Sequence, residues 1–148
     1  MAEAGIAPVE PGVADAAALG FRLGFFKLVV RDLPTMVRFY IETFGFQERD
    51  RVALPGLEEV MLALPGDRFT LVLYHHTDGR DITVGNGHGP VGFTTADLDG
   101  AMARAFAHGA TPMSGPFDLR GLRLAFIRDP EGHEIELIQP PVPVASKE

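Results

Sequence analysis

The chain contains no cysteine, so a disulfide framework, thiolate metal ligands and a cysteine nucleophile are excluded. Positive charge is also scarce, because 13 Lys and Arg stand against 20 Asp and Glu, a formal net charge of −7 at pH 7. A negative surplus repels phosphate backbones and anionic lipid headgroups. No apolar run approaches the roughly 18 to 20 residues that a membrane-spanning helix needs. We therefore expect neither a nucleic acid nor a membrane as a partner.

The N-terminal segment lacks the features of a secretory signal. Residues 1–20 include neither Lys nor Arg and contain Pro8, Pro11 and Gly12, whereas a signal has a basic start and an unbroken apolar stretch. With 148 residues and 46% apolar content, the chain is about one domain long. A domain of this size buries roughly two-thirds of its unfolded surface. The expectation is a cytoplasmic protein with a flexible arm over residues 1–24.

Apolar periodicity divides the remaining chain into two halves with the same order of elements. The predicted strands cover residues 25–30, 46–52, 58–64 and 69–74 in the first half, and residues 91–95, 111–114, 123–128 and 133–138 in the second. A helix follows the first strand of each half, beginning at Asp32 or Asp97 and stopping at Gly45 or Gly109, since Asp is a favoured N-cap and Gly a favoured helix stop. Each half is therefore a βαβββ module.

The two halves also align with each other. A shift of 64 places residues 58–74 on residues 122–138 without a gap, and it sets Glu136 opposite Val72. We predict an α+β fold of two tandem βαβββ modules, 25–74 and 90–139. The Gly-rich segment 75–89 is the predicted linker, and the Pro-rich residues 140–148 form a tail that cannot continue a central strand.

Two stretches carry a family resemblance. Asp-Leu opens the helix of each module, and the second module closes with Asp-Pro-Glu-Gly-His-Glu-Ile-Glu-Leu over residues 129–137. With the βαβββ repeat, these features resemble the vicinal-oxygen-chelate superfamily, which includes glyoxalase I, bleomycin-resistance proteins and extradiol dioxygenases. The resemblance covers residues 25–139 and implies a cupped, half-barrel mixed sheet that binds a small organic molecule. It also implies a homodimer, in which exposed sheet edges become covered.

The resemblance further identifies four positions where metal-using members carry ligands. They lie on the first and last strands of the modules, and here they are Phe25, Val72, Pro90 and Glu136. Only Glu136 can bind a metal, and a stable divalent site needs about three or more protein ligands. We therefore expect no metal at these positions and no other cofactor.

Three histidines near the linker leave an alternative open. His75, His76 and His88 lie close in sequence to Asp78 and Asp81, so they could form a displaced metal site or be solvated loop residues. A metal-dependent, glyoxalase I-like lyase or dioxygenase would need such a site.

Strand alternation predicts which side chains face the cup. Lys27 shares a face with Phe25, whereas Phe26, Leu28 and Val30 should pack beneath the helix. By the same parity, His133 lies outside the cup. The cup face is then expected to include Tyr74 beside Val72, Thr94 beyond Pro90, Glu134 beside Glu136, and Arg123, which the repeat aligns with Glu59.

These expectations leave two main classes of function. In the first, the protein binds a small organic molecule in an apolar cup that includes Phe25, Val72, Tyr74, Pro90, Thr94, Arg123 and Glu134. In the second, it is a metal-independent lyase or isomerase in which Glu136 and Lys27 move protons next to a carbonyl group. The two charged residues could instead form a structural salt bridge, and a desolvated Lys27 could form a Schiff base.

Overall fold

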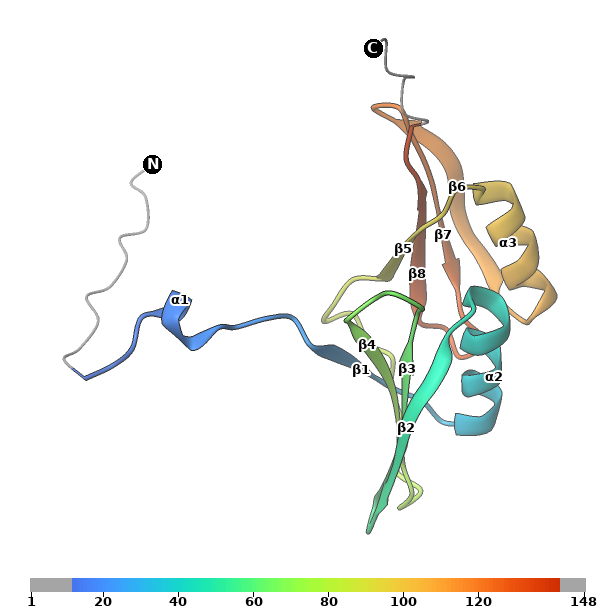
Figure 1. Ribbon diagram of the computed structural model, residues 1–148. Coiled ribbons are helices and arrows are strands. Elements are labelled where there is room, and N and C mark those ends of the chain that lie inside the picture. Colours follow the sequence, from blue (N-terminus) through green and yellow to red (C-terminus); the bar gives the residue numbers. More distant parts are fainter. Residues whose placement is uncertain (1–11, 142–148) are drawn as a thin grey trace.

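The computed structural model describes residues 12–141, so the start of the predicted arm and the end of the predicted tail, residues 1–11 and 142–148, lie outside the described residues. The described part of the arm contains a one-turn helix, α1 (Ala16–Leu19), and projects away from the body (Figure 1). Within residues 12–141, no helix has the length and apolar character needed to cross a membrane.

The rest of the described chain forms the two expected modules. Module one contains β1 (Phe25–Val29), α2 (Leu33–Phe44), β2 (Gln47–Leu54), β3 (Leu57–Ala63) and β4 (Thr70–His76). Module two contains β5 (Val91–Thr94), α3 (Leu98–Ala107), β6 (Thr111–Leu119), β7 (Leu122–Arg128) and β8 (Glu134–Gln139). The predicted fold class is confirmed, and the largest difference is β6, which extends five residues beyond the predicted end at residue 114.

Each module folds into its own mixed sheet. The strand orders are β1-β4-β3-β2 and β5-β8-β7-β6, with the first strand of each module parallel to the last. The sheets are not closed into a barrel, and α2 and α3 lie next to each other on one side of the molecule (Figure 1). We call the opposite face of each sheet its cup face.

Both main helices begin as predicted, and α2 ends at the predicted Gly45, whereas α3 ends at Ala107 with His108 as its C-cap, one residue before the predicted stop. The side chain of Asp32 accepts a hydrogen bond from the Thr35 backbone N–H at 3.1 Å, and that of Asp97 accepts one from Gly100 N–H at 3.0 Å. These bonds satisfy donors that the first helical turn leaves free. Gly45 ends α2 in the left-handed conformation with φ 81°, which glycine adopts without steric cost.

The core lies between each sheet and its helix. Leu28 and Val30 of the first strand are 2% and 0% exposed, and Leu71 and Leu73 on β4 share that face. The predicted parity of β1 is therefore confirmed for these residues. Phe26 differs, since it is 37% exposed and contacts the ring of His88 instead of packing beneath α2.

The internal repeat contains a one-residue offset that the gapless alignment missed. β8 follows β4 at the shift of 64, but Glu59 pairs with Tyr74 while Leu124 pairs with Ile138, so β7 follows β3 at a shift of 65. The cause is the turn before the last strand, which spans residues 64–69 in module one and only 129–133 in module two. A one-residue change reverses every side chain of a strand.

Candidate functional site

The cup face of module one carries an ion pair. Lys27 on β1 donates a 2.5 Å hydrogen bond to Glu59 on β3 across the intervening strand β4. The side chain of Glu59 is only 8% exposed, whereas that of Lys27 is 42% exposed. The ammonium group also lies 5.2 Å from the centre of the Tyr74 ring and 5.8 Å from that of Phe25. Aromatic faces attract cations at such distances, so three neighbouring side chains together fix the position of the Lys27 charge.

The cup face of module two carries the carboxylate of Glu136. Its neighbours across the sheet are Gly92 on β5 and Phe126 on β7. Glu136 is half-buried and, among the described residues, has no hydrogen-bond or ion-pair partner. The salt bridge between Lys27 and Glu136, one of the alternatives that the sequence left open, does not form within the described chain, because Lys27 pairs with Glu59.

The two cup faces differ at every charged position. The register places Gly92 where module one has Lys27, Leu124 where it has Glu59, and Ile138 where it has Tyr74. Leu124 is 6% exposed, so an apolar residue packs well at that place in the fold. The βαβββ module does not need a charged pair there.

Some of the other predicted cup residues lie on the cup faces, and others line a cavity between the modules. Tyr74 lies on the predicted face and Val72 is buried beside Lys27, whereas Phe25 is 61% exposed. Pro90 and Thr94 line a cavity that lies between the modules, which is described below. Glu134 pairs with Arg128 in the register of β8 and shares the face of Glu136.

Arg123 is not on the cup face. It pairs with Gln139 in the sheet register, and its guanidinium lies 3.4 Å from the carboxylate of Asp99 on α3. Its expected position was wrong because the gapless repeat ignored the shorter turn of module two. The counterpart of Glu59 is Leu124 instead.

The donor set does not fit the metal site of the family. Phe25, Val72 and Pro90 have no ligating group, which leaves the single carboxylate of Glu136. His75 and His76, at the end of β4, contact different groups. Nδ1 of His75 lies 3.1 Å from the Val30 carbonyl oxygen, whereas the ring of His76 packs against Tyr74. No three His, Asp or Glu side chains of residues 12–141 are grouped as a metal site requires.

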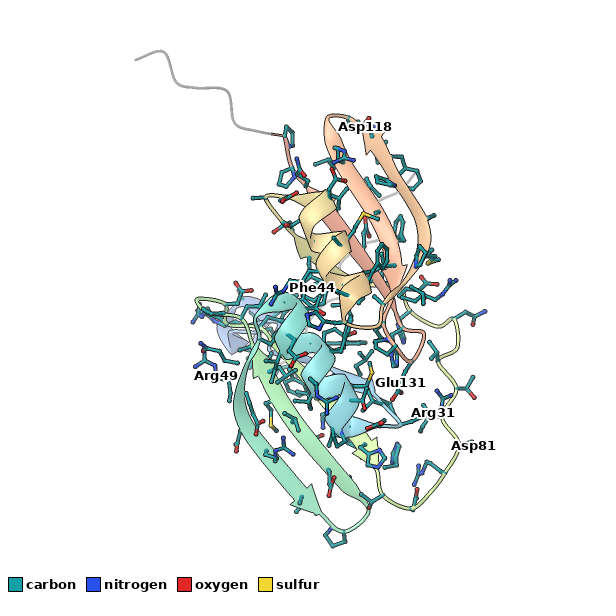
Figure 2. The ribbon with its side chains drawn as sticks, turned by 90° about the vertical axis from the view of Figure 1, so that its right-hand side faces the viewer. Arg31, Phe44, Arg49, Asp81, Asp118 and Glu131 are labelled. Carbon is teal, nitrogen blue, oxygen red and sulfur yellow. The ribbon has the colours of Figure 1, made fainter. Side chains whose placement is uncertain are left out.

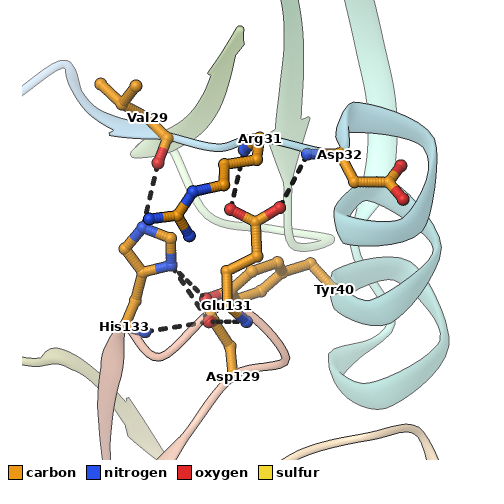
Figure 3. Close-up of polar contacts among 7 residues, drawn as sticks. All are labelled: Val29, Arg31, Asp32, Tyr40, Asp129, Glu131 and His133. Atoms are coloured by element: carbon orange, nitrogen blue, oxygen red, sulfur yellow. Dashed lines mark hydrogen bonds and ion pairs between the residues drawn. The ribbon is translucent and has the colours of Figure 1, made fainter. Parts of the chain in front are cut away.

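The motif at residues 129–133 forms a polar joint between the modules that the sequence did not reveal. The carboxylate of Asp129 is 2% exposed and accepts hydrogen bonds from the Tyr40 hydroxyl at 2.7 Å and from Nδ1 of His133 at 2.8 Å (Figure 3). The carboxylate of Glu131 accepts 2.7 Å bonds from the backbone N–H groups of Arg31 and Asp32. Nε2 of His133 lies 3.0 Å from the Val29 carbonyl oxygen. We call the four side chains, the two backbone N–H groups and this carbonyl the intermodule clamp.

Aromatic packing reinforces this joint. Phe44, at the end of α2, lies where the two helices meet (Figure 2) and stacks on Phe93 of β5 with ring centres 3.9 Å apart and planes 6° from parallel. Because hydrogen bonds and aromatic stacking both cross the boundary, we expect the two modules to keep one relative orientation.

Burial and charge act together on the clamp. Burial raises the pKa of the Tyr40 hydroxyl well above its usual range, and the adjacent Asp129 carboxylate raises it further, so Tyr40 stays a neutral donor. For His133, burial lowers the pKa, but the hydrogen bond and charge of Asp129 and the contact with the Val29 carbonyl outweigh it, and the net direction is upward. Both ring nitrogens of His133 face oxygen acceptors, which only the imidazolium satisfies with two donors. His133 lies outside the cup, as its parity predicted.

Stability should therefore depend on pH through His133. A pKa raised by folding stabilises the protein fully below the unfolded value near 6.5, and this contribution is lost as pH rises through the folded pKa. We expect the free energy of unfolding to decrease above about pH 6.5, and His133→Gln to remove this part of the slope. Urea unfolding of wild type and His133→Gln at several pH values between about 6 and 9 gives the difference in their free energies of unfolding. The contributions of the other histidines are the same in both proteins and cancel in this difference. Parallel pH profiles would show that folding does not raise the pKa of His133, and a wild-type stability that rises with pH relative to the variant would show that the folded imidazole is neutral.

Comparisons with known proteins agree with this architecture. Residues 22–137 match the family model of the Glyoxalase/Bleomycin resistance protein/Dioxygenase superfamily, and the chain belongs to that superfamily. An uncharacterized protein of Mycobacterium bovis is 31% identical over 121 residues, which cover 76% of this chain and 80% of that protein. A lactoylglutathione lyase of Arabidopsis thaliana is 29% identical over 117 residues, which cover 74% of this chain but only 41% of the plant protein.

Solved structures show the same fold. A glyoxalase family protein from Bacillus cereus superposes with a TM-score of 0.77 at 23% identity, covering 87% of this chain and all of that one. TnmS3, an antibiotic-binding protein from Streptomyces sp. CB03234, superposes with a TM-score of 0.65 at 26% identity, covering 81% of this chain and 96% of that one. Relatives of this chain thus include both a lyase and a binding protein.

Proposed function

We propose that this protein binds a small organic molecule between its cup faces, without a metal at the family's ligand positions. The observation that carries the proposal is the Lys27–Glu59 pair with Tyr74, which stands where module two has Gly92, Leu124 and Ile138. A half-buried ion pair contributes little net stability compared with apolar packing, and the second module folds without one. A fixed positive charge beside aromatic rings instead suits recognition of a polar group on an organic ligand.

The cup is completed, in this proposal, by a second copy of the chain. Large apolar side chains remain exposed along the strands that bear the cup faces, including Phe25 at 61%, Phe117 at 47% and Met113 at 38%. Exposed apolar side chains that gather along two sheets are typical of an interface. In a homodimer that sets module one against the partner's module two, Lys27 and Glu136 would share one cavity.

A metal-independent lyase or isomerase is the second candidate. Glu136 is half-buried on a face with Phe126 and has no protein partner among the described residues, which is the environment of a carboxylate that moves a proton. Lys27 would stabilise an oxyanion on a carbonyl compound. The plant relative is named as a lyase, and the Streptomyces protein is named as an antibiotic-binding protein.

One preparation, purified without chelator, tests the proposal. Light scattering should give twice the chain mass of 16.0 kDa, and elemental analysis should find less than one equivalent of Ni, Zn, Fe or Mn. Chelation should leave the melting temperature unchanged. In a thermal-shift screen of carbonyl compounds, ligands should raise that temperature as mass action requires.

Recovery of the compound unchanged identifies a binding protein, whereas conversion that Glu136→Gln abolishes identifies the enzyme. A full equivalent of metal would instead support a displaced site near His75, His76 or His88.

A further inference from the structure

A cavity lies on the face of the first sheet opposite the Lys27–Glu59 pair. It has a volume of about 580 Å³ and begins beyond the end of α2, between module one and β5. Small-molecule sites typically measure about 300–1,000 Å³. Its apolar lining includes four phenylalanines and two leucines, which are Phe26, Phe46, Phe69, Phe93, Leu64 and Leu71.

The module-one wall of this cavity lies on the opposite face of the first sheet from the Lys27–Glu59 pair. Phe26 and Leu71 alternate with Lys27 and Val72 along their strands, so they stand on opposite faces of the sheet. Neither Lys27 nor Glu136 lines the cavity. A ligand held here would contact aromatic rings and would be separated from the Lys27–Glu59 pair by the first sheet.

The cavity lining contains one carboxylate, that of Asp67. His88 is the other ionisable lining residue, and no Lys or Arg belongs to the lining. The turn that carries Asp67 is fixed by a 3.0 Å hydrogen bond from its backbone N–H to the Leu64 carbonyl oxygen. Among the described residues, the carboxylate of Asp67 has no ion-pair partner. A ligand with a positive charge would supply that partner.

The remaining wall is the edge of a strand. β5 pairs with β8 on one side and is the first strand of its sheet, and all four of its residues, Val91–Thr94, line the cavity. Consecutive strand residues point to opposite faces, so a wall made of all four exposes backbone as well as side chains. An edge strand offers unpaired N–H and C=O groups, which can bind the polar edge of a planar ring system.

We propose that this cavity binds an aromatic amine, with its ring among the phenylalanines and its ammonium group at Asp67. Each part of such a ligand has a matching surface. The apolar rings bury the aromatic system, phenyl faces attract the adjacent cation, and the Asp67 carboxylate pairs with the ammonium. An aromatic acid of the same size would meet the carboxylate with like charge.

Three indole compounds that differ in charge test the proposal, namely tryptamine, the neutral alcohol tryptophol and the anion indole-3-propionate. By titration calorimetry, tryptamine should bind at least about fivefold more tightly than tryptophol, and indole-3-propionate most weakly. Asp67→Asn should remove the preference for tryptamine while tryptophol still binds. Phe69→Ser should weaken all three, because it removes an exposed ring of the lining without disturbing the core.

A matched control and a site-specific readout complete the experiment. Asp118→Asn removes a carboxylate that lies at the far end of module two (Figure 2) and should leave all three affinities unchanged. In amide NMR spectra, tryptamine should shift the signals of Asp67, His88 and Phe93, and Lys27→Met should not alter its affinity. Equal affinities for the three compounds, or shifts confined to Tyr74 and Glu136, would overturn the proposal. Either outcome leaves the cup proposal standing, since that rests on different residues.

Discussion

Asp129→Ala is expected to lower the free energy of unfolding by about 3–5 kcal/mol, the cost of breaking a buried charge pair by removing one partner. Asp129 accepts bonds from the Tyr40 hydroxyl, from Nδ1 of His133 and from the backbone N–H groups of Glu131 and His133. Alanine would leave these donors without an acceptor in a buried place, and each unsatisfied donor is costly. It would also leave the imidazolium without its counter-charge.

Denaturant unfolding measures this loss, and two variants separate its causes. Asp129→Asn keeps the shape and an acceptor oxygen but removes the charge, so it should cost less than alanine. Tyr40→Phe removes a single hydrogen bond and should cost about 1 kcal/mol. A loss below about 1 kcal/mol for Asp129→Ala would mean that the joint between the modules does not depend on this carboxylate.

Lys27→Met is expected to cost about 1–3 kcal/mol and to abolish ligand binding at the cup. The substitution keeps the length of the side chain but leaves Glu59, which is 8% exposed, as a buried carboxylate without its partner. It also removes the cation that the Tyr74 ring faces. The loss of stability and the loss of binding have different origins, so a second substitution can separate them.

The double variant Lys27→Met/Glu59→Leu should regain the lost stability without regaining ligand binding. Leucine fits this position, since Leu124 occupies the equivalent place in module two and is 6% exposed. Replacing an ion pair by apolar residues of similar volume is often neutral or stabilising. Unfolding and the thermal response to a ligand found in the screen give the two readouts. If the double variant bound that ligand as wild type does, the pair would be structural only.

The sequence predicted the fold well because its signals are local. Strand and helix periods, the caps at Asp32 and Asp97 and the stop at Gly45 each depend on a few adjacent residues. The parity of β1 placed Lys27 correctly for the same reason. These features needed no knowledge of how distant segments meet.

The partners of the charged residues were not predictable in the same way. Lys27 pairs with Glu59, which is 32 residues away, and Asp129 pairs with Tyr40, which is 89 residues away. The predicted face of Arg123 was wrong by one residue, because the turn before the last strand is one residue shorter in module two and this reverses the faces of β7. Parity within one strand is local, but its agreement with a neighbouring strand depends on the turn that joins them.

The residues of the intermodule clamp, which hold the two modules together, differ from the residues proposed to bind a ligand in the cup. None of the clamp's hydrogen bonds involves Lys27 or Glu136, and they connect β1 and α2 to the turn before β8 (Figure 3). Substitutions in the cup should therefore leave the relative orientation of the two modules unchanged. The Asp-Pro-Glu-Gly-His motif therefore indicates how the two modules are held together, and it carries no information about which ligand the cup binds.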